Sequence, residues 1–408
     1  MARILIIAYT TYAFDGRVRY HAEALAERGD KVDVICLDGP ALADTKGVRV
    51  NGLKIRRYRG QSRHQYVRSY LRFFWGAAAR AVKLSMSGRF DIVIVCTMPD
   101  AMILSALPTR FFGSRIVLDV HDTMPELYRD KFGGRRGAIG ARLLMAEERA
   151  SAWLADRVIA VHEPHRRRLS AAGIPERKIS VVANAPDPRL FNLVHNGNGH
   201  RPDSDFTIAC HGTITHRIGI DILLDAMNLL RSSIPGLKLL VIGRGDYLEQ
   251  AKKHAADVGV ADITEFAAAV PLEMLPNLLT RASVGVVPNR ATSATQLMLP
   301  VKLLEYISLG IPVVAARLGA IQHYFSEDSI GFFEPGNTED LARALEEMYR
   351  EPIFRAERAA RARKSMESAL NWSSERKCYC SVIDSLLGAA PGRDNGRANQ
   401  DYLHAGGK

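Results

Sequence analysis

Short apolar runs rich in valine and isoleucine alternate with segments of helical periodicity along almost the whole chain. This alternation indicates an α/β fold, in which helices connect parallel strands. Because the runs are almost continuously apolar, we expect strands that are buried on both faces of their sheet. The expected strands are residues 3–8, 31–37, 91–96, 115–119, 157–161 and 179–182 in the first half, and 206–210, 237–242, 283–287 and 312–315 in the second.

The two series of strands predict two doubly wound domains. The length of 408 residues fits this organisation, because single domains rarely exceed about 250 residues. We expect a first domain over residues 1–194 and a second over residues 206–371. A polar segment rich in glycine and asparagine, residues 195–205, predicts a linker, and residues 389–408 predict a flexible tail.

Several protein classes are disfavoured by what the sequence lacks. Its five cysteines are scattered, without a CxxC pair or metal-ligand spacing, which favours a reducing, cytoplasmic compartment. The first apolar run is too short for a secretory signal, and no uninterrupted apolar stretch reaches the roughly eighteen residues of a membrane span. No GxGxxG string follows a strand and no Walker lysine loop occurs, which disfavours the two commonest nucleotide-binding folds.

Positive charge is concentrated in the first half of the chain. Residues 1–200 carry a net charge of +13 and residues 201–408 carry −2. Residues 46–89 contain twelve lysines and arginines, no acid and six aromatic residues. This mixture is typical of an anionic bilayer surface, although nucleic-acid binding or a solvated basic face would give the same composition. We expect an anionic membrane surface as the partner, contacted through Arg56, Arg57, Arg59 and Arg63.

The loops that follow the strands are the expected place for function, because open parallel sheets bind ligands beyond the carboxyl ends of their strands. Gly16 begins a helix, where backbone amides could approach an anion, although an ordinary tight turn needs the same residue. His121 directly follows a strand and is flanked by carboxylates. This placement favours a role in the site over a structural role.

The second half offers candidates for binding phosphate. The loop after the first strand of this half contains Gly212, which permits close approach of the backbone, and Arg217, whose planar guanidinium matches phosphate oxygens. Lys302 and Glu305 lie three residues apart and share one face near the start of a short helix. They could form an exposed ion pair, or Lys302 could bind a diphosphate while Glu305 accepts hydrogen bonds from a ribose.

Five segments in order, DGRVRYHAEALAERGDKVDVI, DVHDTMPE, VVANAPDPRLF, HGTITHRIGIDILLDA and LPVKLLEYISLGIPVVA, resemble glycosyltransferase family 4. The resemblance extends over residues 1–385. It implies the GT-B fold, two Rossmann-like domains that face a central cleft, and a final helix over residues 372–388 that crosses back to the first domain. It further implies a retaining, metal-independent hexosyltransferase that uses no cofactor. Its donor would be a nucleotide-diphosphate sugar, and its acceptor a saccharide or lipid-linked glycan of cell-surface polysaccharide synthesis.

The resemblance also implies roles for single residues. Gly16 falls in the loop that approaches the donor diphosphate, and His121 falls where the family places a histidine near the donor sugar. Arg217 and Lys302 take the positions of diphosphate contacts. Glu305 matches the second acid of the family's motif of two glutamates separated by seven residues. The expected catalytic residues are therefore His121, Arg217 and Lys302.

The chain departs from the family pattern at two places. Leu297 stands where the motif has its first acid, which helps to hold the donor sugar in the family. Thr213 replaces the usual arginine after the glycine of the phosphate loop, and Ile218–Gly219 replaces a lysine–glycine pair, so that Arg217 must substitute from a neighbouring position. The first departure leaves a catalytically impaired sugar-nucleotide-binding scaffold as the alternative function. We expect no nucleic-acid partner.

Overall fold

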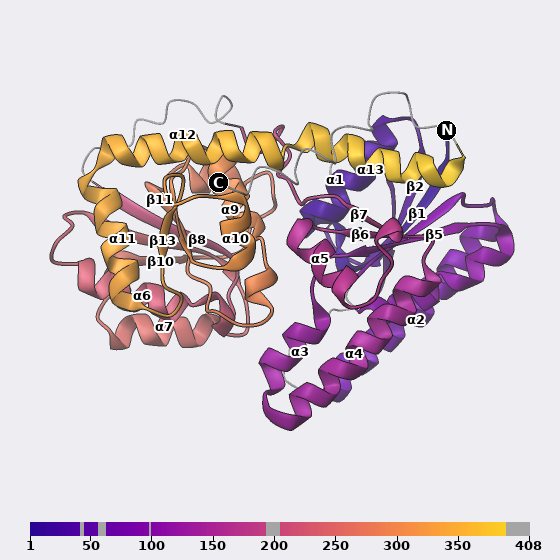
Figure 1. Ribbon diagram of the computed structural model, residues 1–408, viewed down its shortest axis with the longest axis horizontal. Helices are drawn as coiled ribbons and strands as arrows, with labels where there is room; N and C mark the ends of the chain where they lie inside the picture. The colour runs from indigo at the N-terminus through magenta and orange to yellow at the C-terminus, as the bar shows by residue number, and fades with distance from the viewer. Residues whose placement is uncertain (41–44, 56–62, 98, 193–204, 389–408) are drawn as a thin grey trace.

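The computed structural model describes residues 1–408 except 41–44, 56–62, 98, 193–204 and 389–408. The chain forms two domains, each built around its own parallel sheet, as the sequence predicts (Figure 1). The linker expected at 195–205 lies outside the described residues apart from Asp205, and the tail expected at 389–408 lies wholly outside them. Within the described residues, no helix is both long and apolar enough to cross a bilayer.

The first domain contains a seven-stranded parallel sheet with the strand order β3-β2-β1-β4-β5-β6-β7. Its strands are β1 (Arg3–Thr11), β2 (Lys31–Leu37), β3 (Arg49–Leu53), β4 (Ile92–Cys96), β5 (Arg115–Val120), β6 (Arg157–Ala160) and β7 (Ile179–Val181). Its helices are η1 (Tyr12–Phe14), α1 (Gly16–Glu27), α2 (Arg63–Met86), η2 (Asp100–Ser105), η3 (Leu107–Phe112), α3 (Met124–Phe132), α4 (Gly134–Leu154), α5 (Glu163–Ala171) and η4 (Glu176–Lys178).

Both faces of this sheet are covered, which explains why its strands are almost continuously apolar. On one face, Ile4 and Ile6 of β1 pack with Leu25 of α1 in a single core cluster. On the other face, Leu5 and Ile7 pack in a second cluster with residues of α2, η2, α4 and α5. Successive residues of β1 thus point to opposite layers of helices, as a central parallel strand requires.

The second domain contains a six-stranded parallel sheet with the order β10-β9-β8-β11-β12-β13. Its strands are β8 (Phe206–Thr213), β9 (Leu237–Arg244), β10 (Thr264–Ala267), β11 (Val284–Val287), β12 (Val313–Ala316) and β13 (Gly331–Phe333). Its helices are η5 (His216–Ile218), α6 (Ile220–Leu230), α7 (Leu248–Asp257), η6 (Ala261–Ile263), α8 (Leu275–Leu279), η7 (Thr295–Leu297), α9 (Val301–Ser308), α10 (Gly319–Tyr324), α11 (Thr338–Arg350) and α12 (Pro352–Ala369).

The last described helix, α13 (Trp372–Leu387), continues from α12 and lies against the first domain (Figure 1). The ring of His21 on α1 stacks on Tyr379, with 4.0 Å between the ring centroids. Trp372 of α13 packs on Tyr20 of α1. The backbone amide of Ala183 donates to the carboxylate of Glu375 at 2.5 Å. These contacts hold α13 against α1 and against the segment that follows β7.

The sequence missed three strands, β3, β10 and β13, and all three lie at an edge of their sheet. An edge strand pairs on one side only and is less buried, so its sequence need not be a continuous apolar run. The strand β3 has the sequence RVNGL and β10 has TEFA, while β13 contains only three residues. The ten predicted strands are present, with ends that shift by up to three residues.

Candidate active site

The two domains meet through the loops that follow the carboxyl ends of their strands. Arg244, at the end of β9, places its guanidinium 4.7 Å from the ring centre of Phe14, which follows β1. Arg19 on α1 forms an ion pair of 2.5 Å with Glu273 of the second domain. A cleft between strand ends is where open parallel sheets hold their ligands.

Gly16 is the first residue of α1 and lies close to Leu272 of the second domain. The side chain of Asp15 caps the helix by accepting from the amide of Val18 at 3.1 Å. A Cβ atom at Gly16 would lie 3.3 Å from the ring of Tyr20 and 3.5 Å from Leu272 of the second domain. The missing side chain therefore lets the first turn of α1 lie close to the facing domain, while the predicted contact of Gly16 with a diphosphate stays a prediction.

His121 follows β5 and lies beside the buried ion pair of Arg17 and Asp119. Its Nε2 atom lies 3.1 Å from Oδ2 of Asp119. Asp119 also accepts from Arg17 through both oxygens, at 2.8 and 3.1 Å. Burial alone would raise the pKa of the Asp119 carboxyl, but Arg17 and His121 hold it well below its usual range. Asp119 is thus a carboxylate that fixes the orientation of the His121 ring.

The orientation of this ring leaves its second nitrogen available. Because the Asp119 carboxylate can only accept, Nε2 of His121 donates to it, and in the neutral form of the ring Nδ1 presents a lone pair. Nδ1 makes no hydrogen bond within the described residues. The ring can therefore accept a hydrogen bond from a hydroxyl of a ligand.

Cys96, Asp119 and His121 are the described residues whose potential ligand atoms lie close enough for one metal ion, within 4.8 Å of one another. Their chemistry fits a metal poorly. Both oxygens of Asp119 already accept from Arg17. Burial also raises the pKa of the Cys96 thiol well above its usual range, which disfavours the thiolate that a metal needs.

On the second domain, the side chain of Lys302 lies beside Gly212 near the carboxyl end of β8. Gly212 has a φ of +111°, and a Cβ atom there would lie 4.0 Å from Nζ of Lys302. Lys302 is buried, and its Nζ makes no hydrogen bond within the described part of the chain. A buried charge without a partner is strongly destabilising. The arrangement therefore indicates a site built for an anion.

Glu305 does not pair with Lys302, although one turn of α9 separates them. Its Oε2 atom lies 2.6 Å from Nε2 of His211, at the end of β8. Nδ1 of the same imidazole lies 2.8 Å from the hydroxyl of Tyr306. Sequence reasoning missed His211 as a member of the site. The available signal was that it directly precedes Gly212, in the loop already singled out for phosphate.

Arg217 lies in η5, and no described hydrogen bond joins it to the cluster of Lys302, Glu305 and His211. Its carbonyl accepts from the amide of Arg290 at 3.0 Å, and its buried Nε atom has no hydrogen-bond partner among the described residues. The following Gly219 is required by the backbone, because a Cβ atom there would lie 2.0 Å from the carbonyl oxygen of Pro288. Arg217 thus lies in the short helix that follows β8, the strand in which Gly212 lies, and none of its described hydrogen bonds tests its predicted contact with a diphosphate.

The loop around Leu297, which departs from the family motif, is held by the first domain. Asp130 on α3 accepts from the hydroxyl of Ser293 at 2.6 Å and from the amide of Ala294 at 2.9 Å. Partial burial of Asp130 acts to raise the pKa of its carboxyl. The hydrogen bonds from Ser293 and Ala294, together with one from the hydroxyl of Thr292, outweigh this effect and lower the pKa. An acid from the facing domain thus fixes the loop in which the motif's first acid is absent.

Two family models match the chain. "Glycosyltransferase Family 4" matches residues 17–190, and "Glycosyl transferases group 1" matches residues 196–365. Among curated proteins, a GDP-mannose-dependent alpha-(1-6)-phosphatidylinositol monomannoside mannosyltransferase of Mycolicibacterium smegmatis is 31% identical over 170 residues. That match covers 41% of this chain and 44% of the relative, so the chain aligns with less than half of the relative's length.

Solved structures share the fold over nearly the whole chain. Sucrose-phosphate synthase of Thermosynechococcus elongatus matches with a TM-score of 0.77 and 17% identity, covering 96% of this chain and 100% of that one. The Anabaena protein Alr3699/HepE, solved in complex with UDP-glucose, matches with a TM-score of 0.71 and 15% identity, covering 94% and 100%. The fold is therefore GT-B, as the sequence predicts.

Proposed function

Because this chain belongs to the family 4 glycosyltransferases, we propose that it transfers a sugar from a nucleotide-diphosphate sugar to a saccharide or lipid-linked acceptor. The reaction would be that of a retaining, metal-independent hexosyltransferase in cell-surface polysaccharide synthesis, and it would need no cofactor. The observation that carries the proposal is the buried ammonium of Lys302 beside Gly212, which has no hydrogen-bond partner among the described residues. A diphosphate is the anion that such a donor would bring to this place.

In this proposal, the second domain binds the nucleotide part of the donor. Lys302 and Arg217 stabilise the negative charge that grows on the diphosphate as the anomeric bond breaks. Gly212 leaves room for the phosphate oxygens. Glu305 accepts hydrogen bonds from the ribose through Oε1, because only its Oε2 atom is engaged by His211.

The first domain supplies the contact to the reacting sugar. His121, oriented by Asp119, accepts a hydrogen bond from a sugar hydroxyl through Nδ1. No side chain of the cluster is placed as an obvious nucleophile, so we favour attack of the acceptor on the same face from which the diphosphate leaves. The positive charge of the oxocarbenium-like transition state is stabilised by the departing diphosphate itself.

The alternative is a scaffold that binds sugar nucleotides without turnover, which Leu297 favours. The two functions differ in one observable, because both predict nucleotide binding and only the enzyme predicts transfer of the sugar. A thermal-shift screen with UDP, GDP, dTDP, ADP and their sugars is the first test, since a ligand of the native state raises its apparent stability. If none of these ligands raises the melting temperature, both functions fail.

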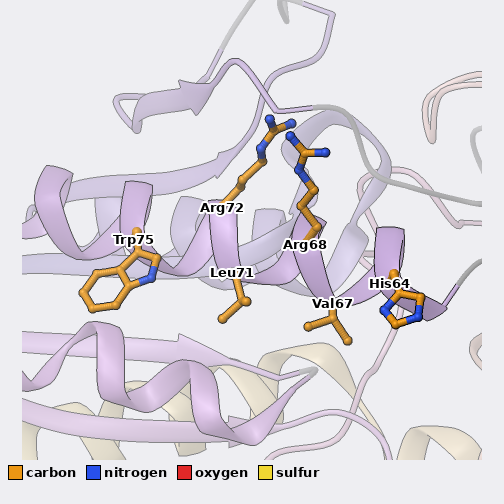
Figure 2. A pocket seen from close by; sticks show the side chains of 6 residues that line it. All are labelled: His64, Val67, Arg68, Leu71, Arg72 and Trp75. Atoms are coloured by element: carbon orange, nitrogen blue, oxygen red, sulfur yellow. The ribbon is translucent and has the colours of Figure 1, made fainter.

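We further propose that the first domain docks on an anionic membrane, at the cytoplasmic face where a lipid-linked acceptor would lie. The supporting surface differs from the predicted one: residues 56–62 and the side chain of Arg63 lie outside the described residues. On α2, exposed Val67, Leu71 and Trp75 form one stripe, and Figure 2 shows the side chains of Arg68 and Arg72 extending away from it. Neither guanidinium has a partner within the described residues.

Further apolar side chains are exposed on helices next to α2. Both α2 and α4 pack against η2, so they belong to one layer over the sheet. This layer exposes Phe111 of η3 and Leu143 and Trp153 of α4, with 94%, 68% and 78% of their surface accessible. Aromatic side chains beside unpaired arginines are the combination that binds the interface of an anionic bilayer. The mycobacterial relative, whose name includes a phosphatidylinositol acceptor, is compatible with this placement.

Replacing Arg68, Arg72 and Trp75 with serine is expected to abolish co-sedimentation with vesicles that contain anionic lipid. The binding free energy lost is about 1 kcal/mol for each arginine, in addition to the buried area of the indole. Wild-type protein should bind neutral vesicles weakly and should be released by salt. As a matched control, Lys253→Ser with Lys364→Ser removes two exposed charges from the second domain and should leave binding unchanged. Binding that ignores lipid charge and the triple substitution would contradict membrane docking through this face.

A further inference from the structure

The side chains of Lys302 and Glu305 would be expected to form an ion pair. They lie three residues apart on α9, a spacing at which opposite charges normally attract each other across one helical turn. In the structure Glu305 is instead bound to His211, and Lys302 has no hydrogen-bond partner within the described residues. The carboxylate next to Lys302 therefore does not neutralise the ammonium group in this arrangement.

Two hydrogen bonds hold the ring of His211. Its Nδ1 atom lies 2.8 Å from the hydroxyl of Tyr306, which also lies 3.0 Å from the carbonyl oxygen of Ala209. Burial raises the pKa of the Tyr306 hydroxyl well above its usual range, so this group keeps its proton. Because the carboxylate of Glu305 can only accept, Nε2 of His211 donates to it at 2.6 Å.

The position of the His211 ring is fixed by its surroundings. The rings of His211 and Tyr306 are perpendicular, with their centroids 4.8 Å apart. Tyr306 is itself locked against β11, because a Cβ atom at Gly285 would lie 2.4 Å from its ring. His211 therefore forms a rigid anchor for the carboxylate of Glu305.

We propose that His211 is a positioning residue that binds Glu305 and thereby keeps Lys302 free for a diphosphate. Without the hydrogen bond from His211, Glu305 turns to Lys302 and neutralises the ammonium group that would bind the anion. This inference deepens the proposed function, since the diphosphate is that of the donor. The pairing itself can nevertheless be tested with a ligand that has neither base nor sugar.

The test is a double-mutant cycle that measures the affinity for inorganic pyrophosphate by titration calorimetry. His211→Leu is expected to weaken binding about tenfold or more, because the competing ion pair must be broken first. Glu305→Gln should bind within about threefold of wild type, since its neutral amide cannot compete for the ammonium. The double variant His211→Leu with Glu305→Gln should recover most of the affinity. A purely structural role of His211 would leave the double variant at least as weak as His211→Leu.

A second variant keeps the test decisive if His211→Leu does not fold, which its melting temperature reports. His211→Gln donates to Glu305 from its side-chain amide and should retain more pyrophosphate affinity than His211→Ala, which cannot. Equal affinities of these two variants, wild-type affinity in His211→Leu, or no pyrophosphate binding by the wild type would each overturn the inference. If the cycle holds and no nucleotide sugar raises the melting temperature, the proposed function fails and the role of His211 stands.

Discussion

Lys302→Ala is expected to lower kcat/KM for the nucleotide-sugar donor by about 10²–10³-fold, the usual effect of removing one preorganised group that stabilises developing charge. The loss should lie mainly in kcat, because the charge on the diphosphate increases towards the transition state. The variant should fold at least as stably as wild type, since it removes a buried ammonium that has no partner in the described residues. Steady-state kinetics and thermal unfolding measure the two effects.

The matched control is Lys253→Ala, which removes an exposed lysine from α7 of the same domain. This variant should keep the kinetic constants of the wild type. Wild-type turnover in Lys302→Ala would mean that the buried ammonium does not contact the diphosphate. A loss confined to KM would show that it binds the ground state and the transition state equally.

His121→Ala is expected to reduce kcat by about 10²-fold or more, while the affinity for the nucleoside diphosphate stays unchanged. The reason is the position of the ring, which Asp119 orients and which faces the reacting sugar in the proposed complex. Asp119 keeps Arg17 as its partner in the variant, so no buried carboxylate is left unpaired. Calorimetry with the nucleoside diphosphate and kinetics with the donor separate binding from catalysis.

A second His–Asp pair supplies the control for this prediction. His254 on α7 pairs with Asp225 on α6 at 2.7 Å, with similar chemistry but far from the strand ends of the first domain. His254→Ala should not change turnover. Unchanged turnover in His121→Ala, or a loss of stability large enough to explain its whole effect, would make His121 a structural residue.

The interior of both sheets could be predicted from the sequence because burial on two faces demands a continuous apolar run. In strands such as β1 and β4, most residues are apolar and buried. The edge strands β3, β10 and β13 escape it, since each pairs with a single neighbour. An edge position alone does not hide a strand, because β7, which pairs with β6 at the other edge of the first sheet, was predicted from its apolar residues.

Those parts of the candidate site could be predicted from the sequence whose residues lie close together along the chain. The pair Lys302 and Glu305 lies on one short helix, and Gly212 follows a strand, so both signals are local in sequence. The partner of Glu305 is not local in sequence, because His211 lies on strand β8, 94 residues before Glu305. Likewise, Arg17 reaches its carboxylate across 102 residues of sequence. Such pairings depend on strand order, which no short motif encodes.

The measurement that tests the account most directly is transfer of the sugar itself. Wild-type protein is incubated with the nucleotide sugar that raises its melting temperature and with a lipid extract or oligosaccharide acceptor, and the product is analysed by nuclear magnetic resonance. The account predicts a new glycosidic bond with the anomeric configuration of the donor, formed at a rate that Lys302→Ala greatly reduces. A product of inverted configuration, or tight donor binding without any transfer to either class of acceptor, would contradict it.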